Sequence, residues 1–333
     1  MKVNQLKRHM PDSDSSLIRY RRSIRTSFFL VLFLVFVGGV VRSTGAGLGC
    51  PDWPKCFGLW IPPTHISEVP DKYWSDPLSS VNGQIIFNPV KTWIEYVNRL
   101  IGVVIGFSIF LQFVFSVLYG PTTVAKRFSL LALVLVLFEG WLGSKVVSSD
   151  LKPLVISLHL FVALILGFAL LTALFYASNR KKPVSAFKSD KSVGWVLWLT
   201  SFLIVFQFFL GTEVRSQVDV LFRKFDFEFR DLYVPQLNWS FYVHRTLSIL
   251  VLIMMFLQVL RFSKRLPVVD LYQVITPLAL TLLLILSGAI LVYFDFPAFV
   301  QPFHLVMGFS IVCGQFWLIL NHRFSDPSSN GSA

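Results

Sequence analysis

Long apolar runs recur along almost the whole chain of 333 residues, and they restrict its fold more than any other feature. A helix needs about 20 mainly apolar residues to cross the hydrocarbon core of a bilayer. The sequence predicts eight such spans, which are Phe28–Val41, Ile94–Tyr119, Phe128–Val147, Leu154–Tyr176, Val193–Gly211, Tyr242–Leu260, Val274–Tyr293 and Phe299–Leu320. Charged residues make up 14% of the chain, whereas soluble proteins carry about 25%. We therefore predict an all-α integral membrane protein with eight transmembrane helices.

The positive charges indicate which side of the membrane each connection faces. The net charge of +12 is spread over short segments between the apolar runs, and Lys and Arg in such segments mark the cytoplasmic side. With the N-terminus inside, most Lys and Arg fall in cytoplasmic segments, so both termini are expected in the cytoplasm. Membrane lipid is the expected surrounding. A nucleic-acid partner is not expected, because no segment is polar enough to form a soluble basic domain.

The chain repeats itself at an interval of 145 or 146 residues. Residues 96–99 (YVNR) correspond to residues 242–245 (YVHR), and the surroundings of His159 correspond to those of His304. Both halves start on the same side, so we predict two four-helix bundles that are parallel repeats about an axis along the membrane normal. The predicted parts are a basic cytoplasmic tail (1–25), an N-terminal half (26–178), a cytoplasmic linker (179–192), a C-terminal half (193–322) and a cytoplasmic tail (323–333).

Three of the six histidines lie inside predicted spans, and the other three, His9, His65 and His322, lie in polar segments. His159, His244 and His304 all fall toward the outer leaflet, where a polar side chain is expected to face the bundle interior. The simplest alternative is a histidine that hydrogen-bonds between helices for packing. His244 and His304 can meet from two helices, which suits the axial ligands of a heme iron. Zinc is disfavoured because no Cys or carboxylate completes its usual ligand set.

The two halves differ at positions that the repeat relates. Asn98 stands where the repeat predicts a histidine, and Glu95 lies one helical turn before it on the same face. We predict a cofactor heme in the C-terminal half and a substrate heme in the N-terminal half, where Glu95 takes or delivers protons. The alternative for Glu95 is an exposed anion at a helix start. Arg99 and Arg245 follow the ligand positions, and each either pairs with heme propionates or extends to lipid headgroups.

Glu139 and the three cysteines are the remaining candidates for chemistry. Glu139 lies near the middle of the third span, where it is either part of a proton path or a neutral hydrogen-bonding group. Cys50 and Cys56 share a polar loop on the oxidising side, where a disulfide is one interpretation and metal ligation with His65 is another. Cys313 lies in an apolar run and is expected to be a small buried side chain.

Several motifs resemble those of the heme A synthase family of bacterial and mitochondrial inner membranes. Residues 40–56, VVRSTGAGLGCPDWPKC, are similar to the end of that family's first helix and its first outer loop. Residues 93–99, WIEYVNR, resemble its Glu-x-x-His-Arg element, and residues 140–144 and 210–215 resemble two further segments. The resemblance extends from about Arg25 to Arg323.

The resemblance implies oxidation of a methyl group of heme O to a formyl group, which gives heme A for cytochrome oxidase. The expected location is the cell inner membrane, and the expected substrate is heme O. A quinone or another compound is expected to accept the electrons. Heme O synthase, cytochrome oxidase assembly factors and a second copy of the chain are the candidate protein partners.

The resemblance also implies roles for individual residues. The implied ligands of heme b are His244 and His304, and His159 is an implied ligand of the substrate heme. Glu95 matches the catalytic acid, and Cys50 with Cys56 matches a loop pair proposed to form a disulfide. The chain departs from the family at Asn98, where many members have a ligand histidine, and at Glu139, where glutamine is usual. The first departure leaves the ligation of the substrate heme open.

Other functions are compatible with parts of the sequence. A membrane cytochrome b, which would exchange electrons with quinone and do no chemistry on heme, needs only the C-terminal heme and not Glu95. A transporter is compatible with parallel repeats, but the sequence shows no paired Gly or Pro interruption at the midplane. Prenyl transfer to heme is disfavoured, because no Asp-rich cluster that would hold Mg²⁺ and diphosphate is evident.

Overall fold

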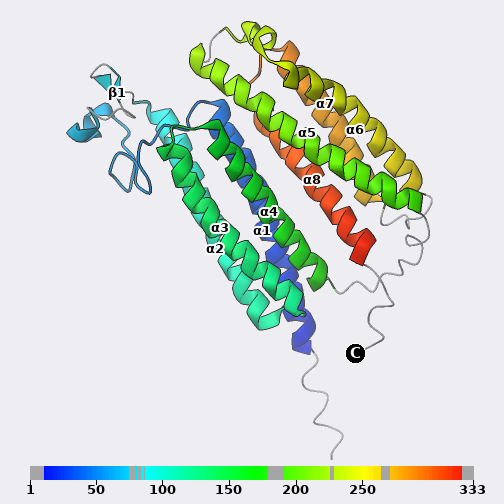
Figure 1. Ribbon diagram of the computed structural model, residues 1–333. Helices are drawn as coiled ribbons and strands as arrows, with labels where there is room; N and C mark the ends of the chain where they lie inside the picture. Colours follow the sequence, from blue (N-terminus) through cyan, green and yellow to red (C-terminus); the bar gives the residue numbers. More distant parts are fainter. Residues whose placement is uncertain are drawn as a thin grey trace, which may run out of the picture. The chain divides into compact units, whose positions relative to one another are not determined.

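The computed structural model describes residues 11–74, 80–81, 84–85, 87–178, 191–225, 229–263 and 271–324. These residues form eight long helices (Figure 1), which are α1 (Pro11–Ser43), α2 (Pro89–Tyr119), α3 (Thr123–Ser148), α4 (Pro153–Ala177), α5 (Lys191–Lys224), α6 (Trp239–Ser263), α7 (Tyr272–Tyr293) and α8 (Val300–Phe324). The connections contain the short 3₁₀ helices η1 (Ile66–Glu68), η2 (Asp71–Trp74), η3 (Arg230–Leu232) and η4 (Val234–Gln236), and the antiparallel strands β1 (Ser80–Val81) and β2 (Gln84–Ile85). The predicted linker and C-terminal tail lie largely outside the described residues, as do His9 and the side chain of His322.

Each of the eight helices in the described part of the chain is long and apolar enough to cross a membrane. Large apolar side chains cover their outer faces: Val103 of α2, Leu137 of α3 and Phe202 of α5 are 70%, 66% and 64% exposed. Soluble proteins rarely expose such side chains in large continuous patches, so lipid is the solvent that covers them. The chain is a multi-pass membrane protein, and the prediction of an all-α fold with eight spans is confirmed.

Two helices extend well beyond their predicted ends. Helix α1 begins at Pro11 and not at Phe28, and α5 continues past its predicted end to Lys224. Hydropathy detects only the part of a helix that lies in the hydrocarbon core, and a helix continues beyond it wherever polar side chains reach water. Arg215 and Asp219 lie one turn apart on α5 and form an ion pair, which supports helix where the sequence predicts the start of a long outer loop.

The first of two compact units comprises the described residues of 1–34 and 46–179. Buried apolar side chains of α1, α2, α3 and α4 form its core, which includes Ile24, Ile109, Ala132 and Leu170. Ser129 of α3 lies 2.8 Å from the hydroxyl of Tyr20 in α1 and accepts a hydrogen bond from Gln112 of α2 at 2.7 Å. Hydrogen bonds between transmembrane helices stabilise a particular packing, so Ser129 fixes the register of three helices.

The second unit comprises the described residues of 35–45 and 180–333. Helices α5 to α8 form a ring in which α5 and α7 each pack against α6 and α8. Gln315 of α8 donates to Gln258 of α6 at 2.9 Å and to Ser201 of α5 at 3.1 Å. Gln258 follows Gln112 by 146 residues, which is the interval of the sequence repeat. Each unit therefore joins its helices through a buried glutamine at a related position.

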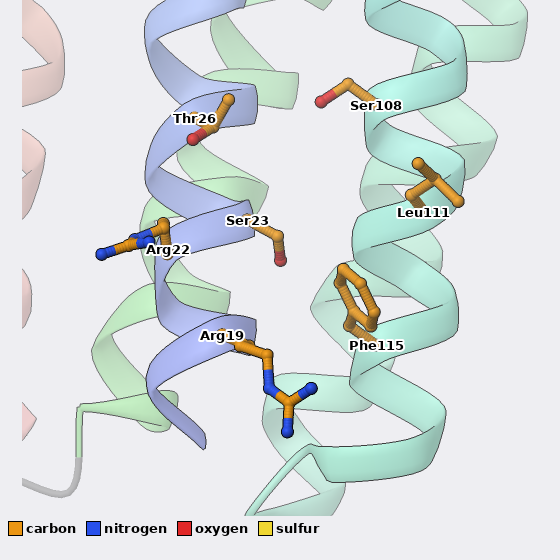
Figure 2. Close-up of a pocket in the computed structure, with 7 residues that line it drawn as sticks. All are labelled: Arg19, Arg22, Ser23, Thr26, Ser108, Leu111 and Phe115. Carbon is orange, nitrogen blue, oxygen red and sulfur yellow. The ribbon is translucent and has the colours of Figure 1, made fainter. Parts of the chain in front are cut away.

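A groove of about 280 Å³ runs between α1 and α2 (Figure 2). Its lining residues are Arg19, Arg22, Ser23, Thr26, Ser108, Leu111 and Phe115. They belong to the first part of α1 and the second part of α2, whereas Glu95 lies within the first turns of α2. The groove is therefore at the opposite end of α2 from the candidate catalytic residue, and it is not the candidate site.

Candidate functional site

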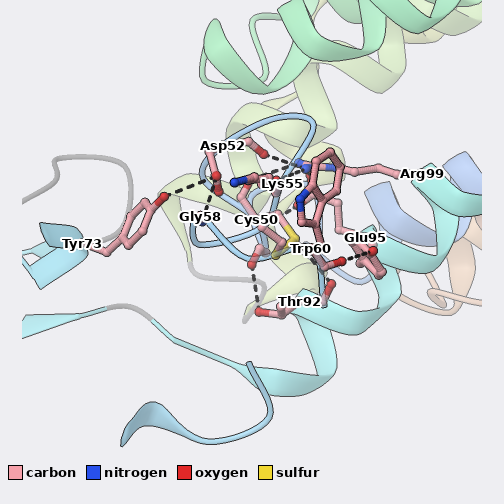
Figure 3. Close-up of a disulfide and its surroundings, with 12 residues drawn as sticks. Cys50, Asp52, Lys55, Gly58, Trp60, Tyr73, Thr92, Glu95 and Arg99 are labelled. Atoms are coloured by element: carbon pink, nitrogen blue, oxygen red, sulfur yellow. Dashed lines mark hydrogen bonds and ion pairs between the residues drawn. A yellow bond between two sulfur atoms is a disulfide. The ribbon is translucent and has the colours of Figure 1, made fainter. Parts of the chain in front are cut away.

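The connection that follows α1 folds against the first turns of α2 (Figure 3). Cys50 and Cys56 are fully buried and joined in a disulfide. The carbonyl of Gly49 accepts a hydrogen bond from Thr92 at 2.8 Å, and a Cβ at Gly49 would lie 2.5 Å from the carbonyl oxygen of Lys91. Only glycine allows this close approach of two backbones. The described residues contain no group of three or more His, Cys, Asp or Glu side chains that could hold a metal ion, so the structure favours the disulfide over metal ligation.

Glu95 is buried beneath this loop, with 2% of its surface exposed. One carboxylate oxygen accepts a hydrogen bond from the backbone N–H of Cys50 at 2.8 Å. The other accepts a hydrogen bond from Arg99 and forms an ion pair with it, one turn along α2. A buried carboxylate is stable only when such partners compensate for the lost water. The alternative of an exposed anion at a helix start is therefore wrong for Glu95.

Arg99 faces the loop and not the lipid headgroups. Its Nη1 donates to the carbonyl oxygens of Asp52 and Lys55 at 2.6 and 3.0 Å, and its Nη2 donates to the carbonyl oxygen of Cys50 at 3.1 Å (Figure 3). A planar guanidinium offers five N–H donors in fixed directions, which suits several acceptors at once. Arg99 thus binds the disulfide loop to α2 and holds the carboxylate of Glu95 at the same time.

Asp52 extends this network away from α2. Its carboxylate accepts hydrogen bonds from the backbone N–H of Gly58 at 2.9 Å and from the hydroxyl of Tyr73 at 3.3 Å. Burial raises the pKa of the Tyr73 phenol, so the hydroxyl remains protonated and able to donate at neutral pH. The loop is therefore stabilised on both sides of its disulfide.

His159 of α4 lies beside Glu139 of α3, with 2.7 Å between Nδ1 and a carboxylate oxygen. This is an ion-pair distance without hydrogen-bond geometry, since Nδ1 of His159 and the second carboxylate oxygen of Glu139 are both buried with no hydrogen-bond partner among the described residues. Asn98, on α2, likewise has a buried side-chain oxygen with no such partner in the described part of the chain. The structure thus brings Glu139 to His159 and Arg99 to Glu95, and no hydrogen bond or ion pair of the described residues joins these two pairs.

His244 of α6 and His304 of α8 both lie in the second unit. Nδ1 of His304 lies 2.8 Å from the hydroxyl of Ser287 in α7. Nδ1 of His244 is buried and has no hydrogen-bond partner among the described residues. The backbone carbonyl of His244 accepts a hydrogen bond from Gln207 of α5 at 2.8 Å. The four helices of this unit therefore all contribute to the surroundings of the two imidazoles.

Each of these imidazoles packs against a glycine on a neighbouring helix. A Cβ at Gly211 of α5 would lie 3.1 Å from Cε1 of His244, and a Cβ at Gly288 of α7 would lie 3.3 Å from Cε1 of His304. Both distances are tighter than ordinary van der Waals contact. The absence of a side chain at these two positions therefore leaves the space that the imidazoles occupy.

Arg245 has surroundings unlike those of its repeat counterpart, Arg99. It is exposed, and its guanidinium lies 5.8 Å from the ring centre of Phe241 and 5.5 Å from that of Tyr242. Cation–π contacts at exposed positions contribute about 0.5–1 kcal/mol. Arg245 is therefore accessible to an anionic group in a way that Arg99 is not.

Sequence reasoning missed two features of the second unit. Arg42 at the end of α1 and Arg215 of α5 both pair with Asp219, and Arg215 also donates to Gln301. Residues 41–43 and 214–216 share the sequence Val-Arg-Ser, which marks both arginines, but Asp219 lies beyond the predicted span Val193–Gly211. The second missed feature is Ser287, the partner of His304. Its counterpart in the repeat is the apolar Leu142, so no polar motif shared by the two halves indicates Ser287.

Residues 21–316 match the model of the COX15-CtaA family, which is described as cytochrome oxidase assembly protein. The chain belongs to this family. A heme A synthase of Shewanella oneidensis is 30% identical over 201 residues, which cover 60% of this chain and 57% of that protein. Heme A synthases of Brucella ovis and Brucella abortus are each 28% identical over 222 residues, which cover 62% of this chain and 59% of theirs. The chain thus matches less than two thirds of the length of these relatives.

The COX15-CtaA match includes every candidate residue described above. Its range begins within α1 and ends within α8, so both compact units belong to the family's common part. The disulfide loop, Glu95 and His159 lie in the first unit, and His244 and His304 lie in the second. Family membership therefore covers the candidate residues of each unit.

Proposed function

We propose that this chain is a heme A synthase, which oxidises a methyl group of heme O to a formyl group to supply heme A to cytochrome oxidase. Membership of the COX15-CtaA family and the names of the relatives support this proposal. The observation that carries the proposal is that the two units hold different kinds of potentially reactive side chain. One unit holds the imidazole pair of His244 and His304, and the other combines a buried acid, Glu95, with one imidazole, His159.

A resident heme b fits the C-terminal half, where His244 and His304 would hold its iron. The buried Nδ1 of His244 has no partner among the described residues, and Ser287 occupies Nδ1 of His304, which leaves the opposite ring nitrogen for a metal. The facing glycines leave the rings room. When bound, heme b supplies one-electron transfer. The exposed Arg245 is the proposed partner of its propionates.

The substrate, heme O, is assigned to the N-terminal half, with His159 as the ligand of its iron. Asn98 replaces the second imidazole, and its buried oxygen has no partner in the described residues. An amide is a weaker ligand than imidazole, and a weakly held group suits a substrate that must react and then leave. Arg99 was a candidate for the propionates, but its donors already bind the loop and Glu95. We therefore assign Arg99 to the positioning of Glu95.

Glu95 is proposed to take up or deliver a proton as the substrate reacts. The Cys50 N–H and Arg99 hold the two oxygens of Glu95 in fixed positions. A general acid or base must lie within hydrogen-bond reach of the group with which it exchanges a proton, so a fixed position favours this role. Burial keeps the group away from bulk water. These contacts support a catalytic role, because a surface carboxylate would need none of them.

A membrane cytochrome b remains the second candidate, and one observation favours it. Both carboxylate oxygens of Glu95 are engaged by the loop and by Arg99, as they would be if Glu95 only anchored the disulfide loop. In that case the C-terminal heme alone would function, and Glu95 would matter for folding but not for heme chemistry.

We propose the cell inner membrane as the location, with both termini in the cytoplasm. The excess of Lys and Arg in the predicted cytoplasmic segments supports this orientation. The proposed parts are residues 26–178 for substrate heme, residues 193–322 for heme b, and cytoplasmic segments at 1–25, 179–192 and 323–333. A quinone or another compound is the proposed electron acceptor. Heme O synthase, oxidase assembly factors and a second copy of the chain are the proposed protein partners.

The heme content of the purified protein tests the proposal. We would express the chain in a host that makes heme O but has no heme A synthase, extract the hemes, and separate them by chromatography. Wild type is expected to yield heme A together with heme B. Glu95→Gln keeps the size of the side chain and its ability to accept from Cys50, and it is expected to retain heme B and accumulate heme O. The exposed Glu213 provides the matched control, because Glu213→Gln is expected to leave the yield of heme A unchanged. Heme B alone in wild type would support the cytochrome instead.

A further inference from the structure

Glu139 and His159 form a polar pair within the apolar part of the first unit. Glu139 lies in the second half of α3 and His159 near the start of α4, and 2.7 Å separates a carboxylate oxygen from Nδ1 of the imidazole. The side chain of Glu139 is 12% exposed. An acid is costly at such a depth in a membrane and is retained where it has a defined partner. The partner here is the imidazole.

A carboxylate on Nδ1 determines how an imidazole binds a metal. At 2.7 Å from Nδ1, the carboxylate favours a proton on that nitrogen, so the other nitrogen, Nε2, is the one that presents a free electron pair. It also fixes the orientation of the ring and makes the imidazole a stronger electron donor. His159 is therefore prepared to bind an iron through Nε2, in a direction set by α3 and not by α4 alone.

The second unit offers an internal comparison. His304 occupies the place of His159 in the repeat, but its Nδ1 meets the neutral hydroxyl of Ser287. The residue that corresponds to Glu139 is Leu284, which is apolar. The anionic partner is thus confined to the unit in which Asn98 replaces the second histidine. The half that offers one imidazole and not two is thus the half in which a carboxylate lies beside that imidazole.

We propose that Glu139 is a positioning residue for the substrate heme: through Nδ1 of His159 it orients the imidazole and strengthens its donation to the iron, in place of the second imidazole that Asn98 does not supply. This inference rests on the proposed placement of heme O in the first unit. A stronger donor stabilises the ferric state, so Glu139 lowers the midpoint potential of the heme bound there. Ser287 gives His304 no such effect, because a hydroxyl carries no charge.

Resonance Raman spectroscopy of the ferrous full-length protein loaded with heme O tests this role. An iron with a single imidazole gives an iron–histidine stretching band, whereas an iron with two imidazoles does not, so the C-terminal heme does not interfere. His159→Ala is expected to abolish the band, which assigns it. Glu139→Gln keeps the shape of the side chain but removes the charge, and it is expected to move the band to lower frequency. Glu139→Gln is also expected to raise the equilibrium ratio of reduced to oxidised heme about tenfold, which raises the midpoint potential by about 59 mV for one electron.

Two controls make the result specific. Glu213→Gln removes an exposed carboxylate from α5 and is expected to leave the band and the potential unchanged. The spectrum of the C-terminal heme is expected to stay the same in Glu139→Gln, which shows that the fold is intact. An unshifted band in Glu139→Gln, or a band that survives in His159→Ala, would overturn the positioning role. A shifted band in a protein that makes no heme A would instead overturn the proposed function and leave the positioning role standing.

Discussion

Replacement of Arg99 by alanine is expected to release the disulfide loop from α2. The guanidinium donates to three loop carbonyls and to Glu95, and the two side chains of this ion pair are 11% and 3% exposed. Arg99→Ala would leave Glu95 buried with the Cys50 N–H as its remaining hydrogen-bond partner. Removal of one partner from a buried ion pair costs about 3–5 kcal/mol. We expect a loss of this size in the free energy of opening the loop.

Hydrogen–deuterium exchange of the protein in detergent micelles measures this quantity directly. The Cys50 N–H is bonded to Glu95, and the Cys56 N–H is bonded to the carbonyl oxygen of Leu59. Because about 1.4 kcal/mol corresponds to a factor of ten, exchange at these positions is expected to rise roughly 100- to 3,000-fold in Arg99→Ala. Peptides of α4 are expected to exchange as in wild type, since local opening does not require the unit to unfold.

Arg245 provides a matched control for this variant. It occupies the equivalent place in the repeat, but it is exposed over two aromatic rings and has no loop to hold among the described residues. Arg245→Ala is expected to cost less than about 1 kcal/mol. Addition of Glu95→Gln to Arg99→Ala is expected to recover about 1–3 kcal/mol, because the unpaired charge is then gone. Equal exchange of the loop in wild type and Arg99→Ala would refute the reasoning.

Two further predictions concern the disulfide and the glycines. Cys56→Ser removes the crosslink of a short loop and is expected to destabilise the loop by about 2 kcal/mol, measured by the same exchange experiment with Cys313→Ser as the control; unchanged exchange would contradict it. Gly211→Ala and Gly288→Ala place a Cβ 3.1 and 3.3 Å from the facing imidazole, and such overpacking costs about 1–3 kcal/mol. Both are expected to weaken the absorption of a heme with two imidazole ligands, whereas Gly194→Ala, which meets open space, is not. Equal spectra in all three would contradict this.

The spans were predictable because lipid imposes one simple requirement on every helix that crosses it. The requirement is a sufficiently long apolar run, which can be read from the sequence. All eight helices of the described chain therefore coincide with predicted runs. The helix ends were not predictable in the same way. Arg215 and Asp219 lie beyond the predicted apolar run of α5, and ion pairs between side chains stabilise the helix there. Hydropathy counts these residues as polar and therefore as loop.

The residue types in the sequence were enough to identify the candidate site. The hydrogen-bond and ion-pair partners of these residues depend on how the helices pack, which the sequence does not show. Glu95 and the cysteines could be selected from the sequence, because an acid at the start of an apolar span and a pair of cysteines in a loop on the oxidising side are both uncommon. The hydrogen-bond acceptors of Arg99 could not be predicted from the sequence. The repeat relates Arg99 to Arg245 and so predicts the same surroundings for both residues. The contact of Glu139 with His159 depends on the relative register of α3 and α4, and no periodicity within one helix contains that information.

The disulfide loop explains why positions that the sequence repeat relates have different surroundings in the two units. In the first unit, the disulfide loop brings backbone N–H and carbonyl groups to the start of α2, where they satisfy Glu95 and Arg99. Without those groups, a glutamate at this depth would be an uncompensated charge. The second unit has Phe241 at the place of Glu95 and an exposed Arg245 at the place of Arg99. At this position of the repeat, an acid can therefore be kept in the first unit and not in the second, and this is why the proposed proton transfer is assigned to the first unit.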